Sequence, residues 1–123
     1  MDPAGLYALF DELRVMLLKE VIGQEKVKER LIRSVQEQRI SHAQLFSGPE
    51  GSGKLPLAIA YAQYISCRQR TDTDSCGECP SCRKYAKLIH PDLHFVFPIF
   101  KPKNNQRPFT DDFLKQWREF VLA

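Results

Sequence analysis

The sequence predicts an α/β fold in which a phosphate-binding loop connects a buried strand to a helix. A short apolar run ends at Gly48, a glycine-rich stretch follows it, and a helical pattern begins at Lys54. A second strand-like run, Leu93–Phe97, comes later in the chain. Four cysteines are clustered between these two parts. Strands that occur together with helices indicate an α/β architecture, and the cysteines indicate an inserted metal module.

The bulk composition is that of an ordinary globular protein. Hydrophobic residues make up 43% of the chain and charged residues 27%, which excludes wholesale disorder. The net charge of +3, from 18 basic and 15 acidic residues, is too small to identify a nucleic-acid-binding protein. No secretory signal or membrane span is visible, because the longest apolar run near the start is Val15–Leu18. We therefore expect a cytosolic protein with reduced cysteines.

Apolar periodicity predicts three helices in the first half of the chain. They cover Leu6–Leu17, Glu25–Gln38 and Lys54–Ile65. Pro56 is compatible with the third helix because it falls in the first turn, where no helical N–H partner is needed. The run Ala43–Ser47 predicts a buried strand before the phosphate-binding loop.

The second half is predicted to contain two shorter helices around one strand. Arg83–Ile89 is predicted as a short helix, and Leu93–Phe97 as a strand that ends before a proline. Residues 101–108 are polar and rich in turn formers, so we expect a loop. Thr110 is predicted to cap a final helix, because two acidic residues follow it at the position where a helix N-terminus favours negative charge.

The glycine-rich stretch matches the phosphate-loop pattern G-x-x-x-x-G-K-[ST] except at its last position. Its residues are Gly48, Pro49, Glu50, Gly51, Ser52, Gly53, Lys54 and Leu55. In such a loop, glycines permit the backbone angles with which successive N–H groups surround phosphate oxygens at a helix N-terminus. We therefore expect a P-loop NTPase fold, with Lys54 between the terminal phosphates of a nucleotide.

Leu55 occupies the position at which a Ser or Thr hydroxyl normally ligates Mg²⁺, and leucine has no oxygen to offer. The sequence also contains no acidic Walker-B strand that would supply the other magnesium anchor. It therefore predicts that ATP with Mg²⁺ binds weakly or not at all, and that no hydrolysis occurs. The alternative is an ATP-hydrolysing motor subunit that manages without the hydroxyl.

The four cysteines have the spacing C-x8-C-x2-C-x2-C. They are Cys67, Cys76, Cys79 and Cys82. Gaps of two residues let thiolates converge on one metal, and four sulfur ligands close a tetrahedral structural zinc site. An iron–sulfur cluster is an alternative, since C-x2-C-x2-C also opens a ferredoxin motif, and a disulfide pair is another. The separate position of the first cysteine, at a helix end, favours one zinc ion per chain.

Basic residues flank the cysteines and raise the alternative of a zinc-dependent nucleic-acid-binding module. They are Arg68, Arg70, Arg83, Lys84 and Lys87. Acidic residues are interspersed with them, namely Asp72, Asp74 and Glu78. This mixture favours a solvated surface over a phosphate-binding patch.

Three motifs resemble a known family. Val21–Glu25 resembles the Gly-Gln box of clamp-loader AAA+ proteins, and Ser41–Pro49 resembles their entry into the P-loop. The cysteine insertion after the P-loop helix is similar to the zinc module of the delta prime and gamma/tau subunits of bacterial DNA polymerase III. The resemblance implies a parallel sheet that is incomplete in this chain, with the zinc module at about residues 67–82.

Leu55 and the run His90–Pro98 look more like delta prime than gamma/tau, which would carry a hydroxyl residue and an Asp-rich second strand. Delta prime implies a non-hydrolysing, stator-like subunit in a cytoplasmic bacterial complex. Its partners would be gamma/tau and delta, and the complex would place the sliding clamp on primed DNA. The alternative is an ATP-hydrolysing gamma/tau-type subunit. The family's arginine finger is expected beyond Ala123.

The resemblance also divides the chain. Residues 16–123 correspond to part of an AAA+ domain, and residues 1–15 are either an upstream extension or an extra helix. In the implied sheet, the strands at Gln44–Ser47 and Leu93–Phe97 are not neighbours. We therefore expect both to have unpaired edges in this chain, which favours association.

Overall fold

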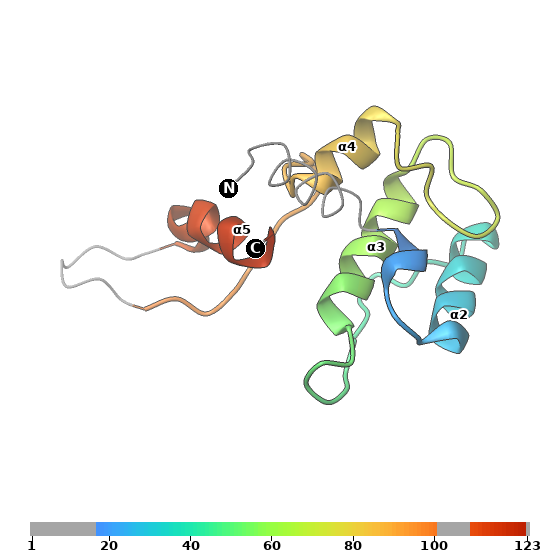
Figure 1. Ribbon diagram of the computed structural model, residues 1–123, viewed down its shortest axis with the longest axis horizontal. Helices are drawn as coiled ribbons and strands as arrows, with labels where there is room; N and C mark the ends of the chain where they lie inside the picture. Colours follow the sequence, from blue (N-terminus) through green and yellow to red (C-terminus); the bar gives the residue numbers. More distant parts are fainter. Residues whose placement is uncertain (1–16, 101–108, 123) are drawn as a thin grey trace, which may run out of the picture.

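The computed structural model describes residues 17–100 and 109–122. The predicted helix at Leu6–Leu17 and the predicted loop at 101–108 lie outside these residues, apart from Leu17. Figure 1 shows the arrangement of the helical segments, which in chain order are η1 (Leu18–Glu20), α2 (Glu25–Gln36), α3 (Lys54–Ser66), α4 (Pro80–Ala86), η2 (Thr110–Phe113) and α5 (Leu114–Leu122).

The core lies between α2, α3 and η1. Helix α3 contacts α2, α4 and η1, so it is the central element of the described fold. The buried core residues are Leu18, Val21, Leu31, Val35, Leu57, Ala60, Tyr61 and Tyr64. The side chains of Ser34 and Tyr61 also form a 2.8 Å hydrogen bond between α2 and α3. Burial of the apolar stripe on α2 confirms the predicted helix there, and α3 matches its predicted range to within one residue.

Helix α2 ends at Gln36, before the predicted Gln38, because the chain turns into a left-handed conformation. Gln38 has φ 55°, and the next N–H, that of Arg39, donates to the carbonyl oxygen of Ser34 at 2.8 Å. This bond satisfies a carbonyl that the helix end would otherwise leave unpaired.

Neither predicted strand forms within the described residues. A strand exists through hydrogen bonds to a neighbouring strand, and neither Ala43–Ser47 nor Leu93–Phe97 has one. Leu45 is 90% exposed and Val96 is 91% exposed, so the first segment is not buried and the second is covered on one side at most. The prediction of strands was therefore wrong for this part of the chain, and the predicted parallel sheet is not present in it.

The segment at 93–100 nevertheless keeps the alternation of a strand. Its odd-numbered side chains are partly buried and its even-numbered ones are exposed. Phe95 and Phe97 pack against Trp117 of α5, with ring centroids 4.3 and 5.1 Å apart. The apolar periodicity that predicted a strand was thus real, but the covered face lies against a helix.

The two C-terminal helical boundaries differ from prediction. Helix α4 begins at Pro80 rather than Arg83, because Cys79 takes the cap position and proline fits the first helical turn. The last helix opens with the 3₁₀ turn η2, and Phe109 rather than Thr110 precedes it. The Phe109 N–H donates to the Asp112 carboxylate at 3.0 Å, so an acidic side chain holds this end in place of the predicted threonine.

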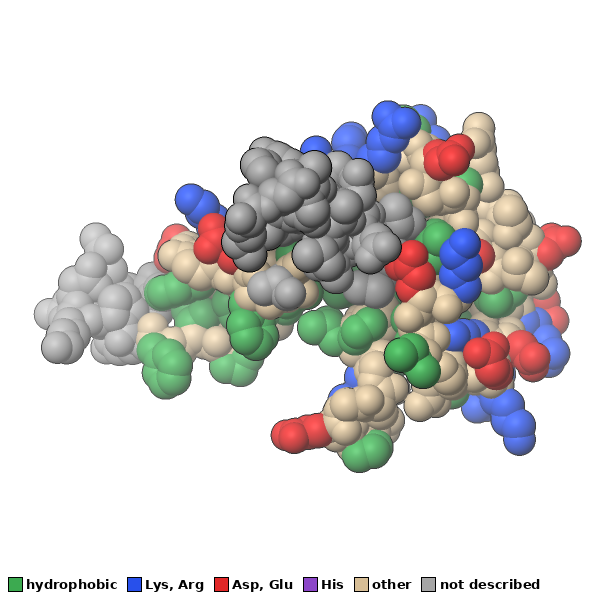
Figure 2. Space-filling model, viewed as in Figure 1, with side chains coloured by type: hydrophobic (Ala, Val, Ile, Leu, Met, Phe, Trp, Pro, Cys, Tyr) green, Lys and Arg blue, Asp and Glu red, His purple; other side chains and the backbone are tan. Residues whose placement is uncertain are grey.

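Helix α5 is joined to α4 by the segment that follows α4 (Figure 1). Arg118 donates from Nε to the carbonyl oxygen of Leu88 at 2.9 Å, which ties α5 to the end of α4. Hydrophobic side chains remain visible over α5 and the segment leading to it (Figure 2). Helices in the described part of the chain are all too short or too polar to span a membrane.

Candidate metal centre and phosphate loop

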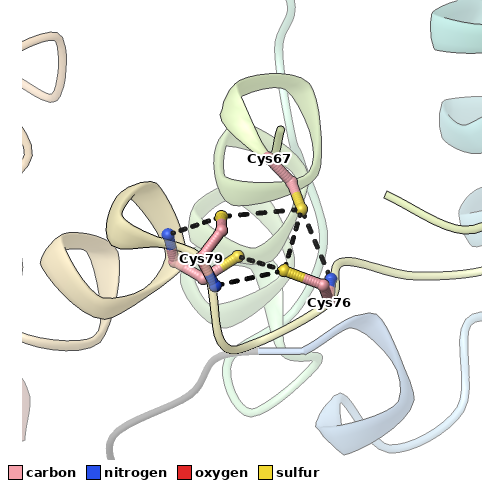
Figure 3. Close-up of side chains that lie close together, drawn as sticks. Cys67, Cys76 and Cys79 are labelled. Atoms are coloured by element: carbon pink, nitrogen blue, oxygen red, sulfur yellow. Dashed lines mark hydrogen bonds between the residues drawn. The ribbon is translucent and has the colours of Figure 1, made fainter. Parts of the chain in front are cut away.

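The four predicted cysteines come together at one point. Cys67 follows the last residue of α3, Cys76 lies in the connecting loop, Cys79 caps α4, and Cys82 lies within α4. Their sulfur atoms all lie within 4.8 Å of one another. Figure 3 shows the side chains of Cys67, Cys76 and Cys79 pointing toward one another. The structure thus places the donor atoms where the spacing predicted them.

Backbone N–H groups surround the sulfur atoms. The Cys76 N–H donates to Cys67 Sγ at 3.3 Å, the Cys79 N–H to Cys76 Sγ at 3.3 Å, and the Cys82 N–H to Cys79 Sγ at 3.4 Å. The turn between Cys76 and Cys79 requires Gly77 at φ 76°, a conformation that glycine adopts without steric cost. Such N–H groups favour the thiolate over the thiol, which is the form that ligates metals.

These surroundings make the thiols chemically unequal. Burial alone would raise the pKa of Cys79, but hydrogen bonds from the backbone N–H groups of Cys82 and Arg68 outweigh it and lower the pKa to about 6. Burial raises the pKa of Cys82, and its neighbours Cys79 and Cys67 add to the increase. Burial also raises the pKa of Cys67. At neutral pH the Cys79 thiolate is therefore ready to bind a metal before Cys67 and Cys82 ionise.

The donor set fits a metal that prefers sulfur and tetrahedral geometry. Three of the four cysteines are buried, so the cluster has little access for a substrate. Four protein ligands also leave no open position for a water molecule on a tetrahedral ion. A metal ion held by all four sulfur atoms would therefore have a structural role and would hold α3, the loop and α4 together.

The loop at 68–75 connects this centre to the helical core. The Asp74 carboxylate accepts hydrogen bonds from the N–H groups of Leu18 and Lys19 at 2.9 and 3.0 Å. Tyr64 donates its hydroxyl to the carbonyl oxygen of Thr71 at 2.9 Å, and Gln36 contacts the carbonyl oxygen of Asp72 at 3.1 Å. Sequence analysis treated Asp74 only as a charge among others, because its partners lie more than fifty residues away.

The phosphate loop has the conformation that its glycines predict. Gly51 and Gly53 adopt φ angles of 76° and 80°, and α3 begins directly after Gly53. A Cβ atom at Gly48 would lie 2.9 Å from Ser52 Oγ, so a side chain there would require the Ser52 hydroxyl to move. Lys54 donates from Nζ to the carbonyl oxygen of Gly48 at 2.6 Å and thus spans the loop.

Several polar groups of the loop fit a phosphate. Ser52 Oγ is buried and has no hydrogen-bond partner. Within the described residues, the N–H groups of Gly51, Gly53 and Lys54 also lack a backbone acceptor. Gln24, in the Gly-Gln box, contacts the carbonyl oxygen of Ser52 at 3.4 Å, a link that sequence analysis did not foresee. The loop can therefore hold a phosphate group, with Lys54 as its charge.

Leu55 is the second residue of α3, and its side chain is 44% exposed. No oxygen is available at this position to ligate a magnesium ion. The cysteine centre cannot substitute for it, because α3 of 13 residues separates the two sites by roughly 20 Å at 1.5 Å per residue. The phosphate loop and the metal centre thus occupy opposite ends of one helix.

These two sites on one helix define a P-loop domain with a cysteine insertion, the class to which the sequence pointed. Residues 23–116, more than half of the 123-residue chain, match the family described as "DNA polymerase III, delta subunit". The chain belongs to this family. The predicted resemblance to bacterial clamp-loader AAA+ subunits is therefore confirmed at the level of the family.

Individual relatives carry the names of several subunits. Over 76 residues the chain is 34% identical to the DNA polymerase III subunit tau of Bacillus subtilis, covering 62% of this chain and 14% of that protein. Over 75 residues it is 37% identical to subunit delta' of the same organism, covering 61% and 22%. It is 41% identical over 75 residues to subunit gamma/tau of Mycobacterium bovis, covering 61% and 13%.

The chain thus spans less than a quarter of the length of each of these relatives. Both delta' and gamma/tau names occur among them at similar identity, so the matches do not separate the two subunit types. No solved structure matches the chain.

Proposed function

We propose that this chain is part of a non-hydrolysing, stator-like subunit of the delta prime type. In that role it assists a cytoplasmic bacterial clamp loader, with gamma/tau and delta as partners, to place the sliding clamp on primed DNA during replication. The family match and the delta' and tau relatives support the clamp-loader assignment. The choice of the non-hydrolysing type rests on one residue.

That residue is Leu55. The loop keeps its glycine conformations and Lys54, so the groups that contact phosphate are present. The hydroxyl that would coordinate Mg²⁺ is replaced by a partly exposed hydrocarbon side chain. Phosphoryl transfer depends on the metal to neutralise charge on the β- and γ-phosphates. A loop that binds phosphate without its metal ligand suits a subunit that retains the fold and leaves hydrolysis to its neighbours.

The test compares Leu55→Thr with Leu55→Val by calorimetric titration of ATP with and without Mg²⁺. Threonine and valine have nearly the same shape, so valine is the control that lacks only the hydroxyl. We expect Mg²⁺ to change the affinity of the unmodified chain and of Leu55→Val by less than about twofold, and that of Leu55→Thr by about tenfold, or 1.4 kcal/mol. Normal ATP hydrolysis by the unmodified full-length subunit would contradict the proposal.

The second candidate is an ATP-hydrolysing gamma/tau-type subunit. The 41% identity to a gamma/tau subunit favours it, as does the intact contact between Lys54 and Gly48. This function requires that the Mg²⁺ ion be held by other groups. In the titration above, a strong Mg²⁺ dependence of the unmodified chain would support it.

We also propose that the metal is a single structural zinc ion per chain, bound by Cys67, Cys76, Cys79 and Cys82. Four sulfur atoms within 4.8 Å of one another, three of them from buried cysteines, support zinc, which favours tetrahedral sulfur ligation in structural sites. Elemental analysis of the purified chain should find about one zinc per chain. Iron in its place, together with a brown colour and visible absorption, would identify an iron–sulfur cluster instead.

A further inference from the structure

A cavity of about 290 Å³ lies beside the metal centre, between α4 and the end of α3. It is distinct from the phosphate loop, which lies at the other end of α3. The residues that line it are Ser66, Arg68, Pro80, Ser81, Lys84, His90, Pro91 and Asp92. Three separate segments contribute basic side chains, so the fold brings together charges that are spread along the sequence.

Only some of the basic residues near the cysteines line the cavity. Arg68 and Lys84 line it, whereas Arg70, Arg83 and Lys87 do not. Within the described part of the chain, neither Arg68 nor Lys84 forms an ion pair. Asp92 is the one carboxylate among the lining residues, so the two permanent cations outweigh it. Figure 2 shows Lys and Arg side chains gathered over α4, the helix that forms one wall.

Two serines are among the lining residues, and within the described part of the chain the hydroxyl of one of them has no partner. Ser66 is paired with the hydroxyl of Tyr85 at 3.0 Å. Ser81 is only 6% exposed, and its Oγ has no hydrogen-bond partner. A buried hydroxyl without a partner is unfavourable, and a hydrogen-bond acceptor in the cavity would satisfy it. Rotation about one bond is sufficient to redirect the hydroxyl of a serine.

His90 supplies a further donor. Its Nδ1 accepts a hydrogen bond from the Asp92 N–H at 3.1 Å. In the neutral imidazole the hydrogen is therefore on Nε2, which remains available to donate. The ring packs against Tyr85 with the ring centroids 4.6 Å apart, and this contact holds it at the rim of the cavity.

We propose that this cavity binds a phosphate group, with Arg68 and Lys84 as the charges and Ser81 and His90 as further hydrogen-bond donors. Each of these four side chains can donate a hydrogen bond, and phosphate oxygens accept hydrogen bonds and prefer cations. Arg68 adjoins Cys67, and Ser81 lies between Cys79 and Cys82, so metal binding fixes the positions of two of the four groups. The phosphate group belongs either to a free anion or to a nucleic-acid backbone.

The test measures binding of two probes to the metal-loaded chain. Inorganic phosphate is titrated by nuclear magnetic resonance, and a labelled single-stranded oligonucleotide is titrated by fluorescence anisotropy at several salt concentrations. Arg68→Gln and Lys84→Gln should each weaken binding about tenfold, as expected for charge-assisted contacts. Ser81 and His90 should show the largest resonance shifts on addition of phosphate.

The matched controls are Arg70→Gln and Lys87→Gln, which remove the same charges from outside the cavity. They should change binding by less than about twofold. Lys54→Gln removes the charge of the phosphate loop, so binding that persists in this variant takes place in the cavity. Saturation by phosphate alone would identify a free-anion site. Oligonucleotide binding whose salt dependence falls in the Lys84 variant would identify a nucleic-acid backbone.

Two results would overturn the proposal. One is the absence of saturable binding of either probe to the unmodified chain. The other is an equal loss of binding in the cavity variants and in their matched controls, which would indicate a general charge effect. Absorption of the cobalt-substituted centre checks that each variant keeps its metal site, so a loss of folding is not mistaken for a loss of binding.

Discussion

Gln38 adopts a backbone conformation that few residues other than glycine prefer. Its φ of 55° lies in the left-handed region, and it closes the C-terminus of α2 in the position that glycine usually occupies. The Gln38 side chain is exposed, so burial does not offset the steric cost of the left-handed conformation. The same conformation at Leu88, after α4, is accompanied by a side chain that is only 2% exposed.

We therefore predict that Gln38→Gly stabilises the metal-loaded chain by about 0.5–1 kcal/mol, because glycine relieves the left-handed strain. Urea denaturation followed by circular dichroism measures the change. Glu29→Gly is the control, since Glu29 is exposed within α2 and glycine there should destabilise by about 1 kcal/mol. A loss of stability in both variants would show that Gln38 is not strained.

The unequal thiols of the metal centre have a measurable consequence. Cys79 has a pKa of about 6 and is mostly ionised at pH 7, while burial keeps Cys67 and Cys82 protonated. Zinc binds thiolates, so binding must displace the protons of the latter two. The lowered pKa of Cys79 means that the folded chain carries this thiolate already at neutral pH. The raised pKa values of Cys67 and Cys82 mean that these two thiols ionise only at higher pH unless a metal displaces their protons. Zinc affinity should therefore increase with pH.

We predict the release of about two or more protons per zinc ion at pH 7, and a zinc affinity that increases between about pH 6 and 9. Calorimetry in buffers of different ionisation enthalpy counts the protons. Cys79→Ser should reduce the affinity while leaving the protons from Cys67 and Cys82 to be released. A release of fewer than one proton would mean that the thiols are already ionised before the metal arrives.

At the scale of elements, the loop at 68–75 and η1 stabilise each other. The Asp74 carboxylate accepts from the Leu18 and Lys19 N–H groups, in the manner of a cap at a helix N-terminus. It also accepts from the Ser75 N–H at 2.8 Å, which holds the loop next to Cys76. Asp74 thus adds a side-chain link between the metal centre and the hydrophobic core, alongside the contacts of Tyr64 and Gln36 with the same loop.

Asp74→Ala should destabilise the metal-loaded chain by about 1–2 kcal/mol, because it removes the acceptor for two N–H groups of η1. Asp72→Ala is the control: Asp72 contacts Gln36 through its backbone carbonyl, which the substitution leaves in place. Thermal unfolding of both variants measures the difference. Equal stability of the two variants would show that the cap contributes nothing beyond its charge.

At the scale of the whole molecule, several large apolar side chains on α5 and near it are exposed to solvent. Val96, Phe100, Phe109 and Phe120 are between 69% and 95% exposed. Val96 and Phe100 belong to the segment at 93–100, whose backbone has no strand partner among the described residues. Contiguous apolar surface next to an unpaired backbone segment favours association between chains.

We predict that the 123-residue chain self-associates at micromolar concentration, and that Val96→Lys reduces this association by placing a charge on the exposed face. Size-exclusion chromatography with light scattering measures the mass. Ile22→Lys is the control, because Ile22 is 93% exposed but lies beside α2, away from the segment. A monomer that stays monomeric at all concentrations would show that these side chains are not an association surface.

Local patterns in the sequence were sufficient to predict α2 and α3 and to single out both candidate sites. The helical stripe of α2 and the glycine positions of the phosphate loop depend on residues close to one another in the chain. The gaps between Cys76, Cys79 and Cys82 likewise set how thiols can converge. The start of α4 was predicted three residues too late because Cys79 was interpreted only as a metal ligand, whereas it also caps the helix.

The sequence by itself thus determined the positions of the phosphate loop, the cysteine ligands and Leu55, since backbone angles and ligand spacing are local properties. Only the tertiary structure decided that the segments at 43–47 and 93–97 have no strand partners among residues 17–100 and 109–122, that Asp74 holds η1, and that Arg68, Lys84 and His90 line one cavity. The physical reason is that a strand, a long-range cap and a cavity each require groups that are distant in sequence to meet in space.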